Sequence, residues 1–194
     1  MNAVSRIGFN SPAAGYDQPL QMWLDCHQRI ARMNALLQRL VDHLKHHPIG
    51  KDAKVTAASI RRYFDEAAPR HHDDEEIDLF PRLLDKLRAQ ADPAAEAVAA
   101  AIAALLADHR EMHDLYQTLR AQLLRLEAGD DPHFDDVQIM LFVSKYRAHI
   151  EIEDGVLAPA LKRMLRARDL KAIGRAMAAR RGIDWDQVTA RMRK

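Results

Sequence analysis

The sequence predicts an all-α protein: an up-down-up-down four-helix bundle with a short basic C-terminal helical extension. Glycine and proline are few, 7 and 8 of 194 residues, and they fall between long stretches rich in alanine, leucine, arginine and glutamine. Apolar residues recur in those stretches with the 3.6-residue period of a helix. The connections between the stretches are short, which favours antiparallel neighbours.

Helix-breaking residues set the bounds of the first two predicted helices. The first helix spans residues 17–47 and ends at the segment His47-Pro48-Ile49-Gly50. The second spans residues 52–90, and we expect Pro69 to break or kink it, because proline lacks the backbone N–H that an interior helical hydrogen bond needs. The short connection between the two helices predicts that they lie antiparallel.

Capping signals set the bounds of the next two helices. Asp92-Pro93 places a capping side chain before a proline at the first helical position, so a third helix begins there and extends to Ala128. The loop Gly129-Asp-Asp-Pro132 separates it from a fourth helix over residues 133–167.

The last part of the chain is predicted to be a separate basic extension. We divide the chain into a bundle with an N-terminal lead-in, residues 1–167, and an extension, residues 168–194, whose one or two short helices are divided near Gly182. Between Ala160 and Lys194 there are eleven lysines or arginines against three aspartates. We expect the extension to cap the bundle as an amphipathic element whose buried side consists of Leu170, Ile173, Met177 and Trp185.

Composition argues against several classes of protein. The net charge of +1 gives no reason to expect a nucleic-acid partner. No apolar run approaches the about 18 residues of a membrane span, so no membrane contact is expected. The first residues lack a secretory signal, and the expected location is the cytoplasm. Cys26 is the only cysteine, which excludes an intramolecular disulfide and a cysteine-based zinc site. The oligomeric state is left open.

One sequence pattern occurs twice, 78 positions apart, and both copies read His-x-x-x-Glu-acid-x-x-Leu-x-Pro, where the acid is Glu or Asp. The first copy extends from His71 to Pro81 and the second from His149 to Pro159. Residues four apart lie on one face of a helix, about 5–6 Å apart at Cβ, so each copy directs one imidazole and one carboxylate towards the same point. Two such points, brought together by the bundle, would form a metal site.

Each of the four helices has a histidine on its apolar face, and the second and fourth also have a glutamate there. A single histidine in such a place is more often a hydrogen-bonded core residue than a ligand. A buried ionised glutamate is different, because without a cation or a proton it costs several kcal/mol. Without metal, we expect two such carboxylates to raise each other's pKa. We expect the apolar line of the fourth helix to include Val156. The polar residues on these faces are His27, His71, Glu75, His109, His149 and Glu153.

The available side chains narrow the choice of metal. Imidazole and carboxylate ligands without thiolate suit iron, manganese or zinc, and six protein ligands exceed what one tetrahedral zinc ion accepts. Two octahedral ions bridged by carboxylates fit this number. Ferritin-like di-iron bundles use Glu-x-x-His, whereas no glutamate here has a histidine three positions later. The sequence therefore predicts a two-metal site built on His-x-x-x-Glu.

From about Pro19 to Met164 the sequence resembles the hemerythrin-like, or HHE cation-binding, domain family. The resemblance rests on both motif copies and on the segments Cys26-His27-Gln-Arg-Ile30 and Asp108-His109-Arg-Glu-Met-His113. It implies a bundle that holds a non-haem centre of two iron ions, which an oxo or hydroxo group can bridge; manganese and zinc are the alternatives. The implied terminal ligands are His27, His71, His109 and His149, and the implied bridging carboxylates are Glu75 and Glu153.

Two further residues stay open as metal ligands. Oxygen-carrying hemerythrins have a second histidine on the third helix, four residues after the first, and His113 occupies that position. They also use a carboxylate five residues after the histidine of the fourth helix, which here is Asp154. Either Glu153 or Asp154 can turn inwards, and we prefer Glu153 because it repeats Glu75. His113 is either a fifth histidine ligand or a flank residue that hydrogen-bonds between helices.

Other polar residues near the motifs are interpreted without a metal. His72 is expected to be solvated. Asp73, Asp74 and Glu76 are expected to form a solvated acidic face that can also guide cations inwards. Cys26 is expected to be a small core residue rather than a ligand.

The resemblance implies three classes of function, and whether the protein is an enzyme is left open. The first is a binding module that takes O2 or NO reversibly, for storage, sensing or scavenging, or that handles iron. The alternative is an iron-centre repair or redox enzyme of the nitrosative or oxidative stress response; those proteins have an N-terminal cysteine-bearing segment not found here, so we favour the first. The third is a regulatory protein that uses the basic extension. Five histidine ligands would leave one open position for a diatomic molecule, whereas four leave more room for water or substrate.

Overall fold

The computed structural model describes residues 15–186 and 188, and all regular secondary structure in this range is helical. This confirms the all-α prediction. The predicted lead-in at residues 1–14 and the basic end at residues 189–194 lie outside the described residues. Among the helices that are described, none is long and apolar enough to cross a membrane.

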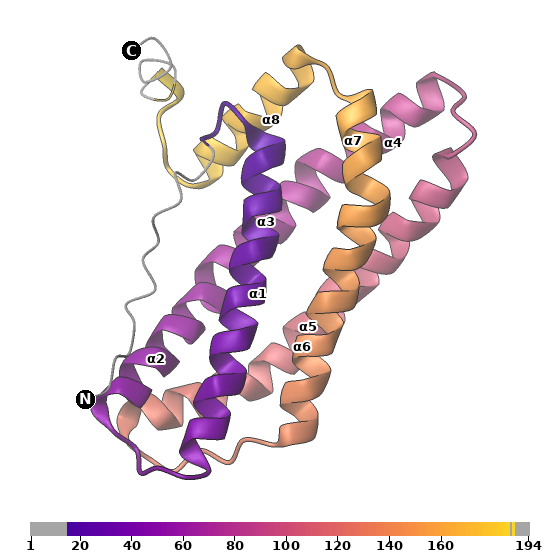
Figure 1. The fold of residues 1–194 in the computed structure, drawn as a ribbon. Helices are drawn as coiled ribbons and strands as arrows, with labels where there is room; N and C mark the ends of the chain where they lie inside the picture. The colour runs from indigo at the N-terminus through magenta and orange to yellow at the C-terminus, as the bar shows by residue number, and fades with distance from the viewer. Residues whose placement is uncertain (1–14, 187, 189–194) are drawn as a thin grey trace.

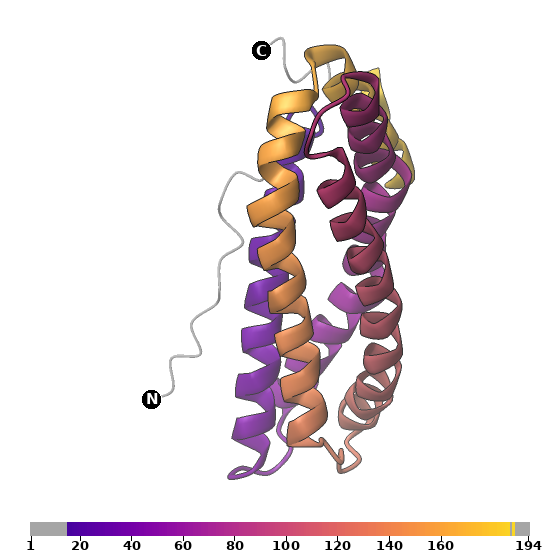
Figure 2. The same cartoon turned by 90° about the vertical axis from the view of Figure 1, so that its right-hand side faces the viewer.

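Long helical rods lie side by side (Figures 1 and 2). The connection from the first to the second rod and that from the third to the fourth lie at one end of the molecule, and the connection from the second to the third lies at the other (Figure 1). The rods are α1 (Pro19–Leu44), a composite of α2 (Lys51–Arg62), α3 (Ala68–Asp73) and α4 (Phe80–Ala89), then α5 (Ala95–Ala128), and a composite of α6 (Asp136–Ile152) and α7 (Ala158–Met164).

Local signals explain where the rods begin and end. Pro19 is at the first position of α1, where a missing N–H costs no helical hydrogen bond. Gly129 follows α5 with φ 98°, the left-handed conformation that glycine adopts readily after a helix. Asp135 caps α6 by accepting a hydrogen bond of 2.8 Å from the backbone N–H of Val137. The fourth rod therefore begins three residues later than predicted, and it ends at Met164 rather than at residue 167.

Three turns of π-helix interrupt the composite rods: η1 (Tyr63–Ala67), η2 (Asp74–Leu79) and η3 (Glu153–Leu157). Each one ends two residues before a proline. A proline ring collides with the carbonyl four residues earlier, and the wider i→i+5 turn moves that carbonyl aside. Of the two alternatives at Pro69, the break is wrong: helix continues on both sides of it, because η1 accommodates the ring. The kink stays a prediction. The prolines are Pro69, Pro81 and Pro159.

The extra residue in a π-helical turn also changes which side chains face the core. A regular 3.6-residue period places Val156 inwards, but this side chain is 42% exposed and its neighbour Leu157 is 0% exposed. The expectation for Val156 is wrong because η3 shifts the helical phase by about one residue at this point.

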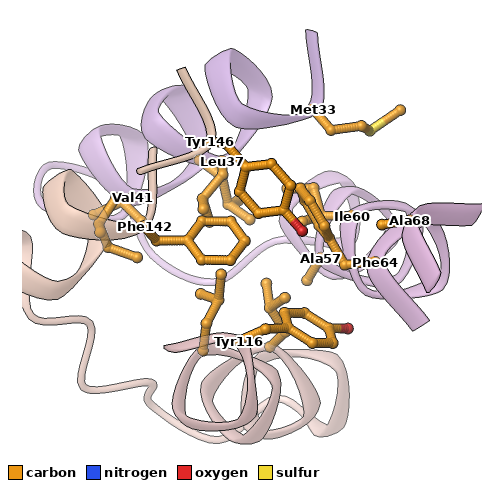
Figure 3. Packing of buried hydrophobic residues seen from close by; sticks show 14 of the residues in the cluster. Met33, Leu37, Val41, Ala57, Ile60, Phe64, Ala68, Tyr116, Phe142 and Tyr146 are labelled. Carbon is orange, nitrogen blue, oxygen red and sulfur yellow. The ribbon is translucent and has the colours of Figure 1, made fainter. Parts of the chain in front are cut away.

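Buried apolar side chains form two clusters with a polar layer between them. One cluster, shown in Figure 3, includes Ile30 and Met112 and fills the end of the bundle near the α1–α2 connection. The other includes Trp23 and Leu105. On α1 the residue between Trp23 and Ile30 that separates the clusters is His27. Polar groups in such a layer have no water to bind, so they must find partners among themselves or in a bound ion.

The helix α8 (Ala167–Arg180) packs against α1 and the second rod after the fourth rod ends. Ile173 and Met177 are buried, as the amphipathic pattern predicts. Gly174 lies so close to the start of α1 that a Cβ atom there would be 1.9 Å from the backbone oxygen of Tyr16. Lys86 on α4 and Asp169 on α8 form an ion pair of 2.8 Å that fixes the first turn of α8.

Candidate metal centre

Six side chains from all four rods meet in the polar layer, and they form two groups. Within each group, the potential ligand atoms all lie within 4.8 Å of one another. Both glutamates belong to both groups, whereas each histidine belongs to one. The first group is His27, His71, Glu75 and Glu153; the second is Glu75, His109, His149 and Glu153.

The two oxygens of Glu75 are directed to different groups. Its Oε1 lies 2.9 Å from His71 Nε2, and its Oε2 lies 3.4 Å from His109 Nε2. This is the arrangement of a carboxylate that bridges two ions, with one oxygen for each.

Glu153 repeats that arrangement with the other two histidines. Its Oε2 lies 3.3 Å from His27 Nε2, and its Oε1 lies 3.4 Å from His149 Nε2. The two motif copies therefore supply equivalent carboxylates, and the histidines of α1 and α5 complete the two groups.

The glutamates have buried polar atoms that lack a hydrogen-bond partner in the part of the chain that the structure describes. Both carboxylates are 0% exposed, and the atoms concerned are Oε2 of Glu75 and both oxygens of Glu153. Nε2 of His27 and Nε2 of His71 are also buried without a hydrogen-bond partner among the described residues. A buried group without a partner costs several kcal/mol, and a cation bound between these atoms would remove that cost. The residues present therefore fit a metal centre.

The pKa values of the two glutamates shift in opposite directions. Burial and the neighbouring charge of Glu75 raise the pKa of Glu153 well above its ordinary range. Burial also acts to raise the pKa of Glu75, but the charge of His71 and the close imidazole of His109 outweigh it and hold this pKa well below the usual range. The expectation that both values rise is thus wrong for Glu75, because two imidazoles stabilise its ionised form.

Burial lowers the pKa of His149 to about 4. Its imidazole is therefore neutral at physiological pH, and a neutral ring has a nitrogen lone pair that can bind a metal. Burial also lowers the pKa of His27. These two rings are thus ready to act as ligands without first losing a proton.

The acid that follows Glu75 or Glu153 in the sequence holds a histidine of another rod from outside. Asp154 Oδ1 lies 2.8 Å from His27 Nδ1, and Glu76 Oε1 lies 2.6 Å from His109 Nδ1. Both acids are about half exposed, 50% and 44%. By accepting from Nδ1–H, such a carboxylate fixes the ring so that Nε2 would face a bound metal ion. Of the two acids in the second copy, Glu153 turns inwards.

His113 and Asp154, the two open ligand positions, lie in neither group. His113 is exposed, and its Nε2 lies 3.3 Å from Gln117 Nε2 on the same helix. Asp154 reaches the centre only through His27. Cys26 is also outside both groups and is buried in the core, where burial acts to raise its pKa but His71 and Tyr63 bring it down to about 7.

Sequence reasoning missed three residues around the centre. Trp23 donates an indole hydrogen bond of 2.6 Å to Glu75 Oε1. His72 was expected to be solvated, but it is partly buried and its ring stacks on that of His109, with centroids 4.0 Å apart. Asp74 was expected on a solvated acidic face, but it is 1% exposed and paired with Arg180, the last residue of α8, and with Arg181 directly after it. Only Trp23 had a usable signal, an N–H donor four residues before His27 on the same face.

Fold and site together define a class: an all-helical protein with a buried cluster of histidines and carboxylates suited to two metal ions. The chain belongs to the hemerythrin family, since the model of the hemerythrin HHE cation-binding domain matches residues 18–161. It is also similar to an uncharacterized protein of Haemophilus influenzae, with 31% identity over 170 residues, 88% of this chain and 94% of that relative.

Replacing the motif prolines is expected to weaken metal binding without loss of stability. Pro81→Ala and Pro159→Ala remove the cause of η2 and η3, so a regular α-helix can form and the glutamates rotate out of their groups. We expect metal affinity to fall at least about tenfold, a size typical for displaced supports of metal ligands. The melting temperature of the metal-free protein should stay equal or rise, because alanine favours helix.

Pro69→Ala is the matched control, since η1 has the same relation to its proline but contains none of the six residues. It should change stability similarly and leave metal affinity within about twofold. Equal losses of metal affinity in all three variants, measured by competition with a chelator, would contradict the positioning role of η2 and η3.

The metal-free protein is expected to be stabilised by Glu153→Gln, more so at high pH. Because the folded-state pKa of Glu153 is raised, the native state binds its proton more tightly than the unfolded state, and stability falls as pH rises from the ordinary glutamate range through the folded value. Glutamine mimics the neutral form at every pH. The gain should be small at pH 5 and about 1–3 kcal/mol at the highest pH tested, measured by urea unfolding up to pH 9. A gain independent of pH would show that Glu153 does not titrate in this way.

Proposed function

We propose that the protein holds two iron ions between its four rods and uses them to bind or sense O2 or NO, or to handle iron. The observation that carries this proposal is that Glu75 and Glu153 each direct their two oxygens to different histidine groups. Nitrogen and oxygen ligands without thiolate suit iron, with manganese and zinc as alternatives.

Each ion would have four protein ligands, two imidazole nitrogens and one oxygen from each glutamate. An octahedral ion would then keep two positions for water or an added ligand. Iron in this place would supply reversible redox chemistry and open positions for a diatomic molecule.

The surrounding side chains would keep the ligands in place and water out. Trp23 fixes one oxygen of Glu75 by its indole hydrogen bond. Asp154 and Glu76 fix the rings of His27 and His109 from the surface side. The apolar clusters on both sides of the layer exclude water, which strengthens each of these interactions.

The second candidate function is an iron-centre repair or redox enzyme of the stress response. The exposed position of His113 favours it, because a set of four histidines leaves more open positions than the five of an oxygen carrier. We place both candidates in the cytoplasm.

The finer description of the fold belongs to this proposal. We infer an up-down-up-down order, residues 1–167, because the connections between rods lie at alternate ends. The basic extension, residues 168–194, would cap the bundle through α8, and we propose no nucleic-acid or membrane partner for it.

Metal content is expected to be about two ions per chain, preferably iron, in protein purified anaerobically from its native host. Glu153→Ala should lose most of the metal, since it removes one ligand from each ion. Asp154→Ala should weaken binding only about tenfold, as for a residue that orients a ligand, and His113→Ala should leave it unchanged. Elemental analysis with a chelator titration measures all three. Equal or reversed losses for Glu153→Ala and Asp154→Ala would favour the oxygen-carrier arrangement.

Optical spectra of the reduced, iron-loaded protein distinguish the two functions. Absorption changes that reverse when O2 or NO is removed indicate a binding module. Net consumption of O2 or NO over many equivalents indicates a redox enzyme. No change with either gas would contradict both the gas-binding and the redox-enzyme proposals and would leave iron handling as the proposed function.

A further inference from the structure

The π-helical turn that carries Glu75 is bound by two arginines at the end of α8. Asp74 and Asp78, on either side of Glu75 in η2, are 1% and 5% exposed. Arg181 Nη2 donates to Asp74 Oδ2 at 2.6 Å, and Arg180 Nη2 donates to Asp78 Oδ2 at 2.7 Å.

Further contacts fix this group of four side chains. Arg180 Nη1 also donates to Asp74 Oδ1, so its guanidinium joins both acids. Arg181 Nη1 donates to Asp74 Oδ1 at 3.0 Å and to the backbone oxygen of Met177 at 3.1 Å, which holds the side chain against its own helix. Charged groups in such planar, two-nitrogen contacts form the strongest hydrogen bonds of a protein.

Within the described residues, the second motif copy has no such anchor. The positions equivalent to Asp74 and Asp78, 78 residues later, are Ile152 and Val156. Neither side chain can bind an arginine by a charge-assisted hydrogen bond, and Val156 is 42% exposed. The two copies are thus alike in the residues of the metal centre and different in what holds them, so the acid pair is not required by the motif itself.

We propose that Arg180 and Arg181 are positioning residues of the metal centre: from α8 they fix η2, keep the Glu75 carboxylate between the two groups, and so make metal retention depend on the docking of α8. This rests on the proposed metal binding. Because Glu75 belongs to both groups, release of η2 speeds the loss of both ions. α8 thereby influences the rate of metal exchange, and it does so through the first motif copy only.

The test measures metal loss from Co²⁺-loaded full-length protein into an excess of chelator. Arg180→Gln with Arg181→Gln removes the charges of the anchor. The matched control is Lys86→Gln, which breaks the ion pair at the first turn of α8 and touches neither η2 nor the centre. The melting temperature of each protein is measured first. Metal-loss rates and Co²⁺ absorption spectra are then recorded well below that temperature.

We expect the double variant to lose metal about tenfold faster and to show an altered Co²⁺ spectrum, because the ligand geometry at Glu75 changes. Lys86→Gln should lower the melting temperature yet leave the rate within about twofold and the spectrum unchanged. Arg180→Lys keeps the charge but loses the two-nitrogen contact, so it should lose metal at an intermediate rate. This variant provides the test if the double variant does not fold.

The outcomes separate this proposal from the proposed function. Wild-type protein that binds two ions, with variants that keep its rate and spectrum, overturns the role of the arginines alone. Equal acceleration in Lys86→Gln also overturns it, since any loosening of α8 would then suffice. Wild-type protein that binds no Co²⁺ and no iron overturns both proposals.

Discussion

The structure depends on two buried glutamates whose oxygens are shared between two histidine groups. Glu75 and Glu153 are 0% exposed, and they lie in a layer with apolar clusters on both sides. A pair of carboxylates in such a place is unfavourable unless positive charge lies between them. In the metal-free protein, imidazolium groups stabilise Glu75 and a proton stabilises Glu153, as their opposite pKa shifts show. Two bound cations would take the place of both the imidazolium charges and the proton.

Two of the three π-helical turns in the described residues lie in this polar layer. η2 and η3 each contain one of the two glutamates that both histidine groups share, and each is followed by the proline of its motif copy. Proline in a helix interior costs about 3 kcal/mol relative to alanine. Such a cost is typical of functional sites, where surrounding structure keeps the unfavourable conformation. The family motif is therefore more than a ligand pattern, since its last residue shapes the turn that presents the carboxylate.

The sequence predicted the parts of the site that follow from helical periodicity and charge. The placement of four histidines and two glutamates on inward faces required only a 3.6-residue period and the cost of a buried charge. The preference for Glu153 over Asp154 came from the repeated motif, in which Glu153 corresponds to Glu75. Periodicity failed at Val156, because a π-helical turn shifts the phase, although Pro159 was its visible cause. Asp74 and His72 were missed for another reason. Their partners, α8 and the ring of His109, are set by tertiary packing that no local pattern encodes.

The central claim is that Glu75 and Glu153 bridge two ions. Anomalous diffraction from crystals of the iron-loaded protein, collected above and below the iron edge, locates the ions directly. We expect two peaks within the bundle, one beside His27 and His71 and the other beside His109 and His149, each within about 2.0–2.2 Å of one oxygen of both glutamates. A single peak, or peaks only at the surface with both carboxylates hydrogen-bonded to protein groups, would contradict the account.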